Sequence, residues 1–94
     1  MTQSRRQQRE VYYSGEVQGV GFRYTVRSLA AGFDVSGFVR NLSDGRVHLV
    51  VEGDTAEIDA FLNAVKQDMG HYIRDVQETI QPTTARFQSF EICR

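Results

Sequence analysis

Apolar and polar residues alternate along residues 11–17 and then switch to helical spacing, which predicts a strand followed by a helix. A loop with two glycines separates the two patterns. Beyond it, apolar residues recur every three or four positions and indicate an amphipathic helix of about three turns. The apolar stripe of this helix consists of Phe22, Val26, Leu29, Ala30 and Phe33. Gly32 stands where a glycine commonly ends a helix.

Four further stretches have strand patterns. Residues 35–42 and 46–52 flank Asp44-Gly45, and an Asp-Gly pair between two strands is a strong signal for a hairpin. Residues 73–80 and 87–92 have strand-like composition but less regular alternation, and a proline interrupts the pattern between them. We therefore expect a well-defined central hairpin and two short strands near the C-terminus.

A second helix is predicted between the hairpin and the last strands. Asp54 can cap it, and Glu57 three residues later completes the pattern of a capping box. Gly70 ends the apolar periodicity. The expected buried stripe consists of Ile58, Phe61, Leu62, Val65 and Met69.

The resulting order is β-α-β-β-α-β with an extra short C-terminal strand. Two helices of this length cannot cover both faces of such a sheet, so both should pack on one face. We therefore predict the α+β class and a ferredoxin-like α/β sandwich, with an antiparallel sheet and two helices on one face. A right-handed crossover makes the first two strands parallel, and the third lies between them. Their ends then share one sheet edge about 10 Å apart, which brings the glycine loop near Asn41.

Composition fits one domain. The chain has 94 residues, 40% of them hydrophobic, and a net charge of −1. We expect a flexible polar tail over residues 1–9 and a single domain over residues 10–94. The near-neutral charge argues against nucleic acid or an anionic membrane as partner, and no apolar run approaches the roughly 20 residues of a membrane span. The one cysteine, Cys93, is compatible with a reducing compartment. We expect a cytoplasmic monomer. We predict no metal site, because neither His48 nor His71 has a partner at metal-ligand spacing.

The loop between the first strand and the first helix has the composition of an anion-binding site. Its glycines let backbone N–H groups converge on one point, the helix N-terminus adds partial positive charge, and Arg23 supplies a forked donor. The glycines alone would equally fit a tight connection. Because a cation is disfavoured at a helix N-terminus, the position of Arg23 favours an anion ligand. Asn41, from spacing alone, is better interpreted as a turn residue.

Two motifs together resemble the paired signature of the acylphosphatases. They read Gly15-x-Val17-Gln18-Gly19-Val20-Gly21-Phe22-Arg23 and Gly37-Phe38-Val39-Arg40-Asn41-x-x-Asp44-Gly45-x-Val47. The resemblance covers about the first two-thirds of the chain and implies hydrolysis of the carboxyl–phosphate bond of acyl phosphates. This chain departs from the family pattern after the second helix, where members often have Gly-Pro and this chain has Gly70-His71.

The resemblance also implies a role for each matching residue. Arg23 would hold the phosphate with its guanidinium, and Asn41 would position the attacking water. The backbone N–H groups of the loop would bind the phosphoryl oxygens, and the loop consists of Gln18, Gly19, Val20, Gly21 and Phe22. The carboxylate leaving group needs no proton at neutral pH, so this chemistry requires neither a general acid nor a metal or other cofactor. The expected partner is a small-molecule acyl phosphate.

Two alternatives use the same scaffold without catalysis. A sheet with Tyr12 and Phe38 on its surface invites comparison with RNA-binding domains. However, residues 46–52 lack the aromatic run on which that binding depends, and the charge is unfavourable. A module that senses a small anion would need the same glycine loop, residues 18–22, and the same Arg23. The sequence does not distinguish such a module from an enzyme.

Overall fold

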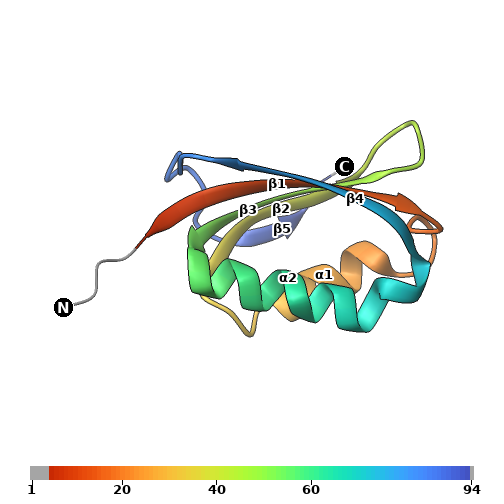
Figure 1. Cartoon of the computed structure of the whole chain (residues 1–94), viewed down its shortest axis with the longest axis horizontal. Coiled ribbons are helices and arrows are strands. Elements are labelled where there is room, and N and C mark those ends of the chain that lie inside the picture. Colours follow the sequence, from red (N-terminus) through yellow and green to blue (C-terminus); the bar gives the residue numbers. More distant parts are fainter. Residues whose placement is uncertain (1–4, 94) are drawn as a thin grey trace.

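The computed structural model describes residues 5–93 and has two layers, a five-stranded sheet and a pair of helices packed on one of its faces (Figure 1). The elements are β1 (Arg6–Gly15), α1 (Phe22–Ala30), β2 (Val35–Asn41), β3 (Val47–Asp54), α2 (Thr55–Met69), the 3-10 turn η1 (Gly70–Tyr72), β4 (Ile73–Gln81) and β5 (Phe90–Ile92). The predicted ferredoxin-like fold is confirmed.

The order of the strands in the sheet is β4-β1-β3-β2-β5. Strands β1 and β2 both pair antiparallel with β3, so they are parallel to each other and flank it as predicted. The expected antiparallel pairing holds from β4 to β2. Strand β5 instead pairs parallel with β2, which makes the sheet mixed. Strand β5 covers the outer side of β2 from Gly37 to Val39, so the pairing stops two residues before Asn41.

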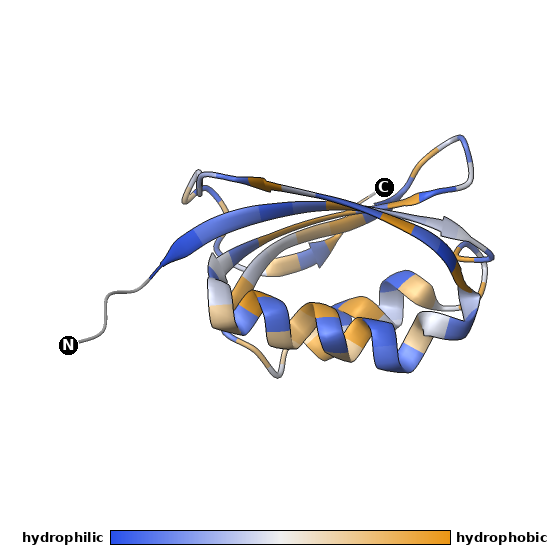
Figure 2. Cartoon of the chain, viewed as in Figure 1, coloured by the Kyte–Doolittle hydropathy of each residue, from blue (hydrophilic) through white to orange (hydrophobic). Residues whose placement is uncertain are grey.

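The core lies between the helices and the sheet. Central strand β3 contributes Val47, Leu49 and Val51, each 0% exposed, and α2 contributes the predicted Phe61, also 0% exposed. Figure 2 shows hydrophobic residues along both helices and the central strands, whereas the first half of β1 is hydrophilic. The predicted apolar stripes are therefore the ones that pack, and their burial supplies the main driving force for this arrangement.

Strand β1 begins earlier than predicted. Residues 6–9, which we expected in the polar tail, pair with β3, and residues 1–4 of that tail lie outside the described residues. Two buried polar side chains interrupt the alternation of apolar and polar residues by which a strand is recognised. Gln8 donates a hydrogen bond to Glu52 at 2.8 Å, and Arg9 forms ion pairs with Asp59 at 2.7 Å and with Glu78 at 2.9 Å. Polar residues are buried here because each meets a partner.

The predicted capping box does not form. The carboxylate of Glu57 accepts a hydrogen bond from the backbone N–H of Asp34 at 2.8 Å, and no backbone N–H of α2 donates a capping hydrogen bond to the N-cap side chain. Glu57 therefore ties α2 to the connection between α1 and β2 instead of closing the first turn of its own helix.

A buried carboxylate fixes the segment between β4 and β5. Because these strands lie at opposite edges of the sheet, residues 82–89 cross its helix-free face. Glu52 is 1% exposed and lies beneath the crossing. It accepts hydrogen bonds from the backbone N–H groups of Thr84 at 2.7 Å and Ala85 at 3.1 Å, and from the hydroxyl of Thr83 at 3.0 Å. The crossing delivers β5 to the edge of β2.

Glu52 should make the protein sensitive to acid. Burial alone raises the pKa of this carboxyl, but the hydrogen bonds from Thr84, Gln8 and Thr83 outweigh burial and lower the pKa to about 2. The unfolded chain then binds a proton at higher pH than the folded one, so stability falls as pH drops from about 5 to 2. We expect this group to account for up to about 3 kcal/mol of the loss.

The measurement is chemical denaturation of the wild type and Glu52→Gln across that pH range. The variant should be less stable at pH 7, and its acid-dependent loss should be smaller. Glu91→Gln, which removes an exposed carboxylate from β5, serves as control and should keep the wild-type slope. Parallel curves for wild type and Glu52→Gln would contradict this role.

Candidate active site

The loop between β1 and α1 is shaped by two glycines in the left-handed region. Gly19 has φ 80° and Gly21 has φ 76°, a conformation that residues with a side chain rarely adopt. A Cβ at either position would meet nothing within 4 Å, so backbone conformation, and not lack of space, requires glycine. Gly21 is the N-cap of α1. The two glycines thus turn the chain directly from the sheet into the helix.

This turn leaves a row of backbone donors without internal acceptors. The backbone N–H groups of residues 18–21 donate no hydrogen bond to any described residue. The first helical bond runs from Thr25 N to Gly21 O at 2.9 Å, so the N–H groups of residues 22–24 belong to the free first turn of α1. Free donors and the positive end of the helix dipole make residues 18–22 suited to bind an anion, and we refer to this segment as the anion cradle.

Gln18 braces the cradle against the hairpin. Its Nε2 donates hydrogen bonds to the carbonyl oxygens of Leu42 at 2.8 Å and Arg46 at 2.9 Å. These two residues also pair with each other through Leu42 N and Arg46 O at 2.8 Å, at the base of the hairpin that follows Asn41. The Gln18 side chain therefore fixes the loop relative to the end of β2.

Arg23 and Asn41 line the same cavity, which has a volume of about 280 Å³. The structure thus brings together the two side chains that the sequence singled out. The complete lining consists of Val17, Gly19, Gly21, Phe22, Arg23, Tyr24, Asn41 and Ile92. Among the predicted loop residues, Val20 packs against the core and Gln18 acts as the brace, so neither side chain lines the cavity.

Tyr24 and Ile92 also line the cavity, although the sequence did not predict either residue as part of the site. Tyr24 follows Arg23 on the first turn of α1, a position from which it could have been anticipated. Ile92 reaches the cavity only because β5 pairs parallel with β2, with Ile92 opposite Val39. No local pattern in the sequence predicts the parallel pairing of β5 with β2.

Arg23 brings an uncompensated positive charge to the cavity. Arg23 is partly buried as a residue, and its guanidinium forms no ion pair or hydrogen bond with any of residues 5–93. The first turn of α1 contains no acidic residue. A cation is unfavourable beside the positive end of a helix dipole. An anion bound between the guanidinium and the cradle would remove this repulsion.

Asn41 presents a hydrogen-bond acceptor that the described part of the chain leaves unused. Its Oδ1 is buried and has no hydrogen-bond donor among the described residues. Buried polar atoms are nearly always satisfied in native proteins, and an exception calls for an explanation. A water or ligand in the cavity would supply the missing donor.

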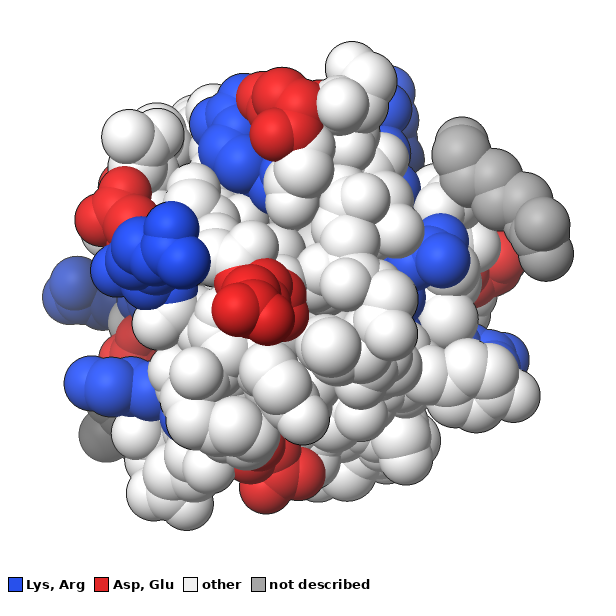
Figure 3. All heavy atoms as spheres, turned by 90° about the vertical axis from the view of Figure 1, so that its right-hand side faces the viewer, with Lys and Arg blue, Asp and Glu red and all other residues white. Residues whose placement is uncertain are grey.

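Figure 3 shows the end of the molecule that carries the right-hand loops of Figure 1, where separate basic and acidic groups are spread over the surface and one acidic group lies near the middle. Within residues 5–93, no cluster of three or more His, Cys, Asp and Glu could hold a metal ion. No helix in the same range is long and apolar enough to span a membrane.

Comparison with known proteins identifies this arrangement. The model of the acylphosphatase family matches residues 9–92. An acylphosphatase from Archaeoglobus fulgidus is 41% identical over 85 residues, which cover 88% of this chain and 93% of that protein. The crystal structure of acylphosphatase from Bacillus subtilis superposes with a TM-score of 0.84 at 31% identity, covering 94% of this chain and 99% of that one. The chain therefore belongs to the acylphosphatase family.

Proposed function

We propose that this protein hydrolyses the carboxyl–phosphate bond of acyl phosphates in the cavity that Arg23 and Asn41 share. The products are a carboxylate and inorganic phosphate. One observation carries the assignment of the site. An arginine and a buried amide oxygen, which have no counter-ion and no donor among residues 5–93, line one cavity beside the anion cradle. The family supports the reaction, and this geometry supports the roles of the residues.

The phosphate is bound first. The N–H groups of residues 18–22 and the guanidinium of Arg23 surround its oxygens, so that positive partial charges lie where charge is spread in a loose transition state. The helix dipole of α1 adds to this field. The cradle is formed before the substrate arrives, because Gln18 holds the loop to the hairpin.

Water then attacks in line with the bond that breaks. Asn41 Oδ1 accepts a hydrogen bond from this water and fixes its oxygen opposite the acyl group. The new bond forms between the water oxygen and phosphorus, and the electron pair of the broken bond leaves with the carboxylate. No Asp, Glu or His lines the cavity. The proton of the water therefore passes to a phosphate oxygen of the substrate, which serves as the base.

We further infer a cytoplasmic monomer acting on a small molecule, with a single domain that includes residues 6–9 of β1 as well as the residues from 10 onward that we expected in it. The RNA-binding alternative is weakened by the engagement of the relevant side chains on the helix-free face. Tyr12 stacks on His48 with ring centroids 4.6 Å apart, and Arg46 forms an ion pair with Asp44 at 2.9 Å. The single cysteine, Cys93, is compatible with a reducing compartment.

The activity is tested with purified protein, benzoyl phosphate and excess EDTA, following release of benzoate. We expect turnover well above a buffer blank and competitive inhibition by inorganic phosphate. Protein purified in the same way from an Arg23→Gln clone controls for contaminating phosphatases. A rate equal to the blank, together with saturable phosphate binding, would instead establish the anion-sensing alternative.

A further inference from the structure

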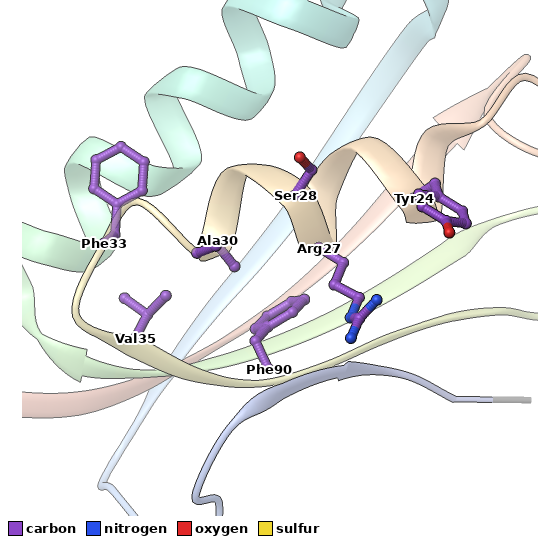
Figure 4. Close-up of a pocket in the computed structure, with 8 residues that line it drawn as sticks. Tyr24, Arg27, Ser28, Ala30, Phe33, Val35 and Phe90 are labelled. Atoms are coloured by element: carbon purple, nitrogen blue, oxygen red, sulfur yellow. The ribbon is translucent and has the colours of Figure 1, made fainter.

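A second cavity adjoins the one that holds Arg23 and Asn41. It has a volume of about 460 Å³ and lies between α1 and the edge formed by β2 and β5. Tyr24 lines both cavities, so the two meet at this side chain. Figure 4 shows Tyr24 and Arg27 extending from α1 on the side where Phe90 of β5 lies, with Phe33 at the far end of the helix. Any group attached to a phosphate in the cradle has this space beside it.

The second cavity contains another arginine that has no counter-ion in the part of the chain that the structure describes. Arg27 follows Arg23 by four residues, so the two side chains lie on the same face of α1, about 6 Å apart along its axis. Arg27 is exposed and forms no ion pair or hydrogen bond with any of residues 5–93. Neither cavity is lined by an Asp or a Glu. The joined lining therefore carries two positive charges and no negative one.

The remaining walls suit a carbon skeleton. The ring of Tyr24, which is 71% exposed, stands at the junction, and the partly buried ring of Phe90 lies across from α1. Aromatic faces pack well against flat or extended carbon groups. The order along α1 is then the phosphate at Arg23, the carbon skeleton at Tyr24 and a positive charge at Arg27.

We propose that the second cavity receives the acyl group of the substrate and that Arg27 selects acyl phosphates with a second anionic group at the far end. This inference rests on the proposed function, because it takes the phosphate to lie in the cradle. Arg27 determines specificity and takes no part in bond breaking. A distal carboxylate or phosphate would pair with its guanidinium, whereas a neutral acyl group of the same shape would leave it unpaired.

The test compares two rigid substrates of matched length and shape, 4-carboxybenzoyl phosphate and the neutral 4-carbamoylbenzoyl phosphate, by their kcat/KM values. Since Arg27 is exposed, we expect the wild type to prefer the carboxylate by roughly fivefold at low salt, and added salt to reduce the preference. Arg27→Gln should bring the ratio close to one, and Arg27→Glu should reverse it. Arg74→Gln removes the same charge from β4, away from both cavities, and should keep the wild-type ratio.

The outcomes separate the two levels of the proposal. If wild type hydrolyses neither substrate, the proposed function is wrong. If it hydrolyses both, and the ratio is unaffected by Arg27→Gln and Arg27→Glu, the reaction stands and the role of Arg27 is overturned. Equal changes in Arg27→Gln and Arg74→Gln would likewise overturn it, because they would reflect net charge alone.

Discussion

Arg23→Gln will lower kcat/KM for benzoyl phosphate by about 10³-fold, because it removes a forked cationic donor from the transferring phosphoryl group. Inhibition by inorganic phosphate will weaken in parallel. Arg23→Lys retains the charge without the fork and will fall between the two. The loss will not come from unfolding. Arg23 makes no ion pair or hydrogen bond with residues 5–93 and lies at the positive end of α1, so its removal should leave thermal stability unchanged or slightly higher.

Steady-state kinetics and thermal unfolding of the same preparations measure both effects. Arg74→Gln is the matched control, since it removes one exposed arginine from β4 and should retain wild-type kinetics. An Arg23→Gln enzyme that keeps a tenth or more of the wild-type kcat/KM, or binds phosphate as tightly as wild type, would show that the guanidinium is not the phosphate ligand.

Asn41→Ala will reduce kcat by about 10²-fold or more while leaving the inhibition constant of phosphate within about twofold. The amide orients the water and leaves phosphate binding to the cradle and Arg23, so its loss should appear in turnover alone. The same substitution removes a buried oxygen that has no donor among the described residues. Stability should therefore stay the same or rise, as expected for a polar group retained for function.

The control for this variant is Asn63→Ala, which truncates an exposed asparagine of α2 and should change neither kcat nor phosphate inhibition. Full turnover in Asn41→Ala would remove the water-positioning role. A large loss of stability would indicate that Asn41 serves the fold, and its kinetics would then need a different explanation.

Hydrophobic periodicity predicted the fold because the core follows it closely. Val47, Leu49 and Val51 alternate on one face of β3, and all three are fully buried. The Asp-Gly turn placed β3 beside β2, and the right-handed crossover then fixed β1 on its other side. These signals are local, or follow from connection rules that hold across proteins.

The parts that the sequence did not predict depend on polar partners far along the chain. Residues 6–9 join β1 because Gln8 meets Glu52, and Arg9 meets Asp59 and Glu78. The path of residues 82–89 depends on the same Glu52. Such buried polar pairs disrupt the alternation from which strands are recognised, and their partners cannot be identified from spacing alone.

The sequence predicted the residues of the candidate site that form a local motif, but not the tertiary contacts around them. Gly19, Gly21 and Arg23 form a local motif whose chemistry follows from residue type, and the predicted topology brought Asn41 to the same sheet edge. Spacing alone favoured a turn residue at Asn41, so its functional interpretation depended on the family resemblance. The unused Oδ1 of Asn41, the brace made by Gln18 and the approach of Ile92 are tertiary features. They appear only when the hairpin, the loop and β5 are assembled.

The central claim is that water attacks phosphorus, and isotope labelling tests it directly. Wild-type protein should hydrolyse benzoyl phosphate in water enriched in ¹⁸O, with EDTA present, and the products should be analysed by mass spectrometry. Attack at phosphorus places one ¹⁸O atom in the released phosphate and none in benzoate. Label in benzoate would mean that water attacks the carbonyl carbon, and it would contradict the roles assigned to the cradle, Arg23 and Asn41.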